Sequence, residues 1–106
     1  MNKMIMRILL YLYEYEITIS GTWDCLFFPN IGEQLYVFPF LSDDDRKSME
    51  MLRCSDVADD IQCSAFQSKH ADNPLLRILY HSPCLIEQKN WQFMDNEWVC
   101  SFVLKL

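Results

Sequence analysis

Glycine is scarce in this chain of 106 residues, which contains only two, and that scarcity excludes several kinds of site. A phosphate-binding loop or a dinucleotide fingerprint needs several glycines close together, as does the Gly-x-Ser-x-Gly turn of many hydrolases. A calcium-binding loop needs a central glycine between alternating oxygen ligands. Gly21 and Gly32 instead stand alone, each where a turn is expected. The sequence therefore contains no motif of these classes.

Clustered positive charge is also missing. Nine Lys and Arg residues stand against fifteen Asp and Glu residues, so the formal net charge is −6. Nucleic acids and anionic membrane surfaces are bound through basic patches. We therefore expect neither a nucleic acid nor a membrane as partner.

Long hydrophobic runs and secretory signals are absent too. Glu14 and Glu16 interrupt the apolar run that begins at Ile8, and no small-residue cleavage site follows it. The five cysteines form an odd set without a Cys-x-x-Cys pair. Free thiols in a reducing compartment are the simplest interpretation, so we expect a cytoplasmic protein.

A metal site is not expected, because a structural zinc site usually shows two close pairs of ligands. The residues that would bind a metal, if any did, are Cys63, His70, His81 and Cys84. The spacing from Cys63 to His70 is too loose for one of the pairs. We therefore predict no metal and no cofactor.

Catalysis is not expected either. A cysteine nucleophile needs a base beside it and a third group to orient that base. Cys84 and His81 are the only such pair close in sequence, and nothing indicates the third group. The adjacent aspartates of the chain are typical of a solvated helix start rather than of a catalytic pair. We therefore expect a protein that is not an enzyme.

The clearest structural signal lies between Cys84 and Leu106. Asp95 and Asn96 tolerate the positive φ of a two-residue hairpin loop, and strand-like alternation flanks them on both sides. The opposite pairs are then Phe93 with Trp98, Trp91 with Cys100, and Lys89 with Phe102. The shared apolar face contains Trp91, Phe93, Trp98, Cys100, Phe102 and Leu104. We expect this face to be buried, with a bulge or strand end near Glu87, which interrupts it.

Three further strands are predicted from short apolar runs. Alternation with odd positions apolar predicts one half-buried strand from Leu9 to Ser20. Residues 33–41 predict a strand that carries Tyr36, Phe38 and Phe40 on one face. Residues 75–80 predict a short strand before the terminal hairpin.

A helix is predicted from Ser42 onward. Ser42 is a good cap, and the carboxylates of residues 43–45 suit the first turn of a helix. Apolar residues at helical spacing continue to Ala65, so we predict one helix, or two short ones broken near Cys54, over residues 43–65. A short strand through residues 61–65 is the alternative.

These elements predict a single α+β domain over residues 1–106. Five or six strands form a small antiparallel curled sheet or an open barrel, and one helical segment (about 43–65) is inserted mid-chain. At the level of fold alone, this pattern resembles an SH3-like barrel. A resemblance of fold does not indicate a function.

Two surfaces are candidate interaction sites. The aromatic residues Tyr36, Phe38 and Phe40 suit a peptide-binding groove or a dimer interface, unless a helix covers them. The acidic residues Asp43, Asp44, Asp59 and Asp60 suit a basic partner, unless they only solvate a helix face.

We therefore expect a non-catalytic protein-interaction module or small accessory protein, which binds a protein partner or a second copy of itself. The first alternative is an acidic inhibitor, of the immunity or anti-defence type, of a protein with a basic site. The second is a small metal protein or enzyme that uses His81 and Cys84.

Overall fold

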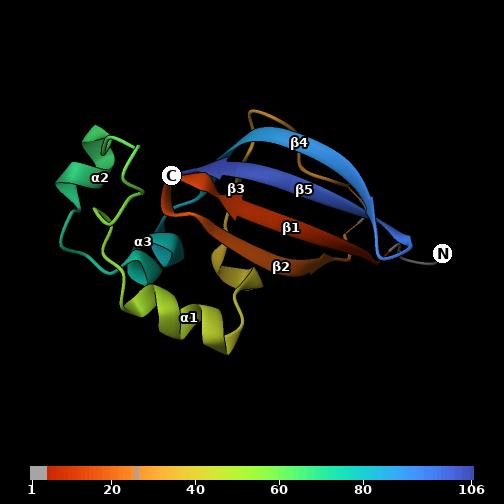
Figure 1. The fold of residues 1–106 in the computed structure, drawn as a ribbon, viewed down its shortest axis with the longest axis horizontal. Coiled ribbons are helices and arrows are strands. Elements are labelled where there is room, and N and C mark those ends of the chain that lie inside the picture. The colour runs from red at the N-terminus through yellow and green to blue at the C-terminus, as the bar shows by residue number, and fades with distance from the viewer. Residues whose placement is uncertain (1–4, 26) are drawn as a thin grey trace.

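Two β-hairpins, one from each end of the chain, make up most of a single curled sheet (Figure 1). The structure is a computed structural model that describes residues 5–25 and 27–106. The strands are β1 (Met6–Leu12), β2 (Ile17–Trp23), β3 (Gln34–Leu35), β4 (Cys84–Met94) and β5 (Glu97–Lys105). The helices are α1 (Asp43–Glu50), α2 (Ala65–Lys69) and α3 (Leu75–His81), and 3-10 turns occupy Tyr13–Tyr15 and Phe38–Phe40.

The strand order in the sheet is β2-β1-β5-β4-β3. The predicted α+β class and the curled, open barrel are confirmed. Every neighbouring pair is antiparallel except β1 and β5, which run parallel, so the sheet is mixed and not purely antiparallel. Figure 1 shows the helices gathered at one end of the sheet, while the opposite end extends beyond them.

The predicted C-terminal hairpin is confirmed in its register. The pairs are Phe93 with Trp98, Trp91 with Cys100, and Lys89 with Phe102. Asp95 has a φ of 51° and Asn96 a φ of 63°, which is the backbone of a tight two-residue loop. The register shifts between Ile86 and Gln88, so the bulge falls at Glu87, as expected. Glu87 is exposed there and accepts a hydrogen bond from the Tyr13 hydroxyl at 3.2 Å.

The single N-terminal strand predicted from Leu9 to Ser20 is wrong, because the chain reverses within it. β1 and β2 are antiparallel neighbours, and Glu16 (φ 55°) ends the turn between them. The buried residues of β1 are the even positions Ile8, Leu10 and Leu12, not the odd ones. Alternation with period 2 indicates which side chains share a face only within one continuous strand. It does not reveal a turn inside the run.

The predicted strand over residues 33–41 is also mostly wrong. Only Gln34 and Leu35 pair with β4, and the chain then enters the 3-10 turn that contains Pro39. Proline has no N–H to donate to a sheet, and its ring fixes φ near the helical value. The predicted aromatic face of this segment therefore does not exist as one strand face.

The predicted helix start at Ser42 is confirmed, but its length is not. The Ser42 hydroxyl accepts a hydrogen bond from the Asp45 N–H at 3.1 Å, and the Asp45 carboxylate accepts one from the Ser42 N–H at 3.0 Å. α1 ends at Glu50, and residues 51–64 are irregular apart from an isolated bridge at Arg53. A separate capping box then starts α2, and the alternative strand through residues 61–65 does not form.

The predicted strand over residues 75–80 is instead the helix α3. Its buried residues are Leu75, Ile78 and Leu79, which is helical spacing. Pro74 stands at its N-terminal cap. An apolar run this short fits either period, so its sequence alone does not separate a buried strand from a buried helix.

A buried polar network holds the irregular segment against the sheet. The Glu14 carboxylate is 4% exposed and accepts hydrogen bonds from the Gln67 side-chain amide at 2.9 Å and from the Leu106 N–H at 2.8 Å. The Tyr15 hydroxyl donates to the Cys54 carbonyl at 2.6 Å. The Ala58 N–H donates to the Glu14 carbonyl at 2.7 Å. Because buried polar groups are costly unless they are paired, the bonds at Cys54 and Ala58 hold the irregular segment to the turn at residues 13–15.

The hairpin loop gives a direct test of this fold. Replacing Asn96 by valine should lower the free energy of unfolding by about 1–2 kcal/mol, because a β-branched residue is disfavoured at positive φ. Asn96→Gly should leave that free energy nearly unchanged. Urea unfolding followed by circular dichroism measures both values, and equal values for the two variants would contradict the loop.

Candidate functional site

The strand registers arrange the inward-facing side chains in rows across the sheet. From the helical end outward, three rows are Ile17–Leu12–Leu104–Ile86, Ile19–Leu10–Phe102–Lys89, and Gly21–Ile8–Cys100–Trp91. In the outermost row, Trp23 lies beside Met6, and Trp98 lies beside Phe93. The predicted apolar face of the hairpin is thus the inner face of the whole sheet.

The helices cover only the two rows nearest the helical end of the sheet. Leu10, Phe102 and Leu104 are fully buried there, in one cluster with Met49 of α1 and Leu75 of α3. This cluster is the core of the domain.

Loop aromatics cover the third row. Phe40 lies over Gly21, where an added Cβ would be 3.0 Å from the Phe40 Cδ1 atom. Phe40 also stacks on Trp23, with ring centroids 5.9 Å apart. On the other side, Phe28 contacts Trp91 edge to face at 5.5 Å. Glycine at position 21 therefore provides the space for the Phe40 ring.

In the outermost row, the loop aromatics Phe28 and Phe40 stack on Trp23 but do not cover Phe93 and Trp98. Phe93 and Trp98 are each 59% exposed, and they touch edge to face at 5.3 Å. Trp91 is 48% exposed. We call Trp23, Trp91, Phe93 and Trp98 the aromatic face. Exposed aromatic groups of this size on a folded chain mark interaction surfaces more often than chance.

The charge around the aromatic face is low. The Lys89 ammonium lies 6.0 Å from the Trp91 ring centroid and donates to the Asn30 side-chain oxygen at 3.2 Å. On the same end of the sheet, Arg7 pairs with Asp95 at 3.5 Å and with Glu97 at 3.6 Å. The acidic groups nearest the hairpin loop are therefore partly neutralised.

A free strand edge runs beside the aromatic face. β3 pairs with β4 only at Cys84 and Leu85, and β4 continues to Met94. Within the part of the chain that the structure describes, no strand pairs with residues 88–94 on that side. Such an edge presents N–H and C=O groups to which an extended segment can add.

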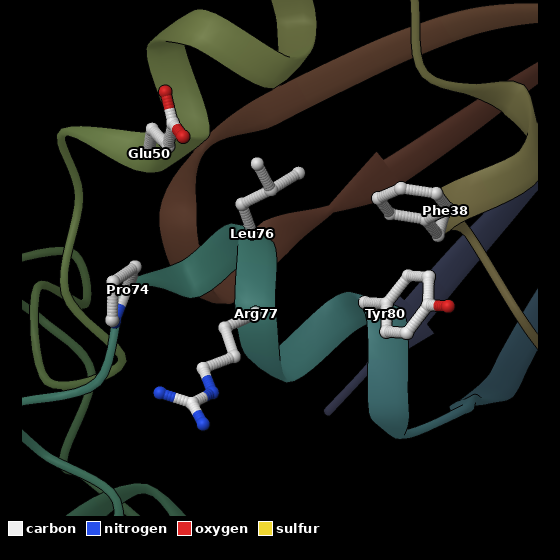
Figure 2. A pocket seen from close by; sticks show the side chains of 6 residues that line it. All are labelled: Phe38, Glu50, Pro74, Leu76, Arg77 and Tyr80. Atoms are coloured by element: carbon white, nitrogen blue, oxygen red, sulfur yellow. The ribbon is translucent and has the colours of Figure 1, made fainter.

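A separate cleft of about 280 Å³ lies between α1, α3 and the 3-10 turn at Phe38–Phe40. Figure 2 shows Leu76 pointing between Glu50 and Phe38, with the Tyr80 ring beside that of Phe38. The two rings meet edge to face at 4.8 Å, and the Arg46 guanidinium lies 4.5 Å over Phe38. Phe38 and Tyr80 already pack against each other there.

The predicted interaction residues are dispersed. Tyr36 is exposed, Phe38 lines the cleft, and Phe40 is half-buried against Gly21, so the three do not form one strip. The acidic residues Asp43 and Asp44 begin α1, and Asp59 and Asp60 lie in the irregular segment. All four are exposed, and none makes an ion pair with another described residue.

The four candidate metal ligands do not converge. His70 and His81 line one hollow, but Cys84 is fully buried, and Cys63 lies elsewhere with its thiol 3.7 Å from the Ser55 carbonyl. Among the described residues there is no group of three or more side chains placed to hold a metal ion. Burial, and secondarily the charge of Glu14, raises the pKa of the Cys84 thiol to about 12. A protonated, inaccessible thiol is a poor nucleophile.

For the aromatic face, the sequence predicted the correct side of the sheet but the wrong burial. Trp91, Phe93 and Trp98 were expected on the inner face, where they lie, but also in the core, where they do not. No described helix is long and apolar enough to cross a membrane. No family model, curated protein or solved structure matches the chain. The SH3-like resemblance therefore stays an expectation.

Cysteine alkylation tests the description of the thiols. At neutral pH, iodoacetamide should modify the exposed Cys25 of the folded protein and spare Cys54, Cys84 and Cys100, which are buried and whose thiol pKa values burial raises. Peptide mass spectrometry identifies the modified sites, and all of these cysteines should react in urea. Modification of Cys84 as fast as Cys25 would contradict its burial.

Proposed function

We propose that the chain is a non-catalytic protein-interaction module that binds its partner through the aromatic face. The observation that carries the proposal is the 59% exposure of both Phe93 and Trp98 on the inner face of the sheet. Elsewhere the inner face of the sheet is covered by helices or by loop aromatics. A partner that covers the outermost row would continue the same core beyond the helices.

The energetics favour this use of the aromatic face. Aromatic side chains dominate the binding energy of protein interfaces, and truncating one such anchor often costs about 2 kcal/mol or more. The free edge at residues 88–94 adds backbone groups beside these rings. A bound strand would therefore gain hydrogen bonds from the edge and side-chain contacts from Trp91 and Phe93.

The chemistry of the site indicates the kind of partner. The aromatic face has one ammonium, Lys89, at its border, and the hairpin-loop carboxylates Asp95 and Glu97 pair with Arg7. An apolar, weakly charged protein segment fits it better than a strongly charged one. That segment belongs to a different protein or to a second copy of this chain. A reducing compartment such as the cytoplasm suits the five free cysteines.

The double variant Phe93→Ser/Trp98→Ser tests the proposal. It should lower partner capture from a cell extract more than tenfold, because it removes both exposed anchors without touching the core. Met51→Ser is the matched control, since Met51 is 86% exposed and follows α1 at the helical end. Circular dichroism confirms that each variant is folded.

Sedimentation velocity separates the two kinds of partner. If the partner is a second copy, the wild type and Met51→Ser should self-associate, and the double variant should remain monomeric. If it is a different protein, all three should be monomers, and only the double variant should lose capture. Equal capture and equal sedimentation by the wild type and the double variant would overturn the proposal.

Inhibition of a protein with a basic site is the second candidate function. The observation that favours it is the exposure of Asp43, Asp44, Asp59 and Asp60 without an ion pair to any other described residue. Unpaired surface carboxylates steer a basic partner toward the chain.

Charge reversal distinguishes this candidate from the first. Changing these four aspartates to lysine should abolish the capture of a basic partner, and changing them to asparagine should weaken it and reduce its salt dependence. Phe93→Ser/Trp98→Ser should then have no effect. The opposite pattern, with loss only in the aromatic variant, would exclude the inhibitor.

A further inference from the structure

α2 and α3 each present a pair of side chains to the same hollow, which has a volume of about 310 Å³. Phe66 and His70 stand four residues apart along α2 and its C-terminal cap, and Arg77 and His81 stand four apart on α3. Residues spaced by four lie on one face of a helix, one above the other. The hollow is therefore built by two facing helix surfaces, far from the aromatic face.

The hollow carries one fixed positive charge, that of Arg77, in a chain whose net charge is negative. The protein has two histidines in all and a formal net charge of −6, yet both histidines and Arg77 line the hollow. No carboxylate lines it. The ion pairs of the described residues use Arg7 and Arg53, so none of them occupies the Arg77 guanidinium. Figure 2 shows Arg77 directed away from Glu50, the acidic residue of the neighbouring cleft.

The remaining side chains add hydrogen-bonding groups in a defined arrangement. The Asn73 side-chain nitrogen lies 3.3 Å from His70 Nδ1, so with that nitrogen donating, the proton of the neutral imidazole is on Nε2. Phe66 holds the same ring at a centroid distance of 4.7 Å. His81 and Ser82 make no side-chain hydrogen bond to the other described residues. Their donors and those of Arg77 are available to a ligand.

We propose that this hollow binds a small oxyanion of the phosphate class, either free phosphate or a phosphate monoester. Arginine binds phosphate through two parallel N–H groups, and imidazole and hydroxyl donors complete the coordination of its remaining oxygens. A metal ion fits less well, because only two imidazoles and no thiolate or carboxylate line the hollow. The site is independent of the proposed protein interaction.

Isothermal titration of the full chain with inorganic phosphate, in a buffer of low ionic strength, tests the proposal. Saturable binding is expected. Arg77→Gln should weaken it about tenfold or more, because it removes the charged guanidinium, and His81→Leu several-fold, because it removes the imidazole donor. Both residues are exposed, so neither change removes a core contact. Arg7→Gln, which deletes the same charge at the far end of the sheet, should leave binding unchanged.

Phenyl phosphate that binds more tightly than phosphate identifies a monoester as the ligand type, with Phe66 beside its organic group, and equal affinity identifies free phosphate. Absence of saturable binding by both probes would overturn the proposal. So would equal weakening by Arg77→Gln and Arg7→Gln, which indicates a general effect of net charge. Binding of zinc chloride without binding of phosphate would overturn the proposal, because the ligand would then be a cation.

Discussion

The parallel pairing of β1 with β5 is the constraint on which the rest of the structure depends. An isolated hairpin is marginally stable in water, and this pairing joins two hairpins into one sheet with a continuous inner face. A tight turn cannot connect parallel neighbours, so the whole of residues 13–96 serves as the connection. The helices within that connection are thereby brought onto the sheet at the end where β1 and β5 finish (Figure 1).

The helices and loops that cover the inner face do not reach the end of the sheet. The two ends of the molecule therefore have different chemistry. At the helical end, Tyr15 and Glu14 hold the irregular residues 51–64 through hydrogen bonds to Cys54 and Ala58. At the same end, both histidines line one hollow. At the opposite end, β4 and β5 extend past the cover and expose Phe93 and Trp98. Both proposed binding surfaces thus lie where the core ends.

Features that depend on near neighbours in the chain were predictable. The hairpin loop at Asp95-Asn96, the bulge at Glu87 and the cap at Ser42 each follow from local chemistry, and the structure contains all three. The candidate sites were only half predictable. His70 and His81 were named only as residues that would bind a metal if any did, and Arg77 was missed because its segment was predicted as a strand. On a helix, the spacing of Arg77 and His81 by four residues would have been the signal.

By itself, the sequence determined the C-terminal hairpin and its register, the start of α1 and the α+β class, because alternation, turn chemistry and capping act over a few residues. Only the tertiary structure decided the reversal between β1 and β2, the helical state of α3 and the exposure of Phe93 and Trp98. A short apolar run is compatible with either a strand or a helix, and its burial depends on what packs against it. That cover comes from residues far away in the chain, whose positions no local pattern specifies.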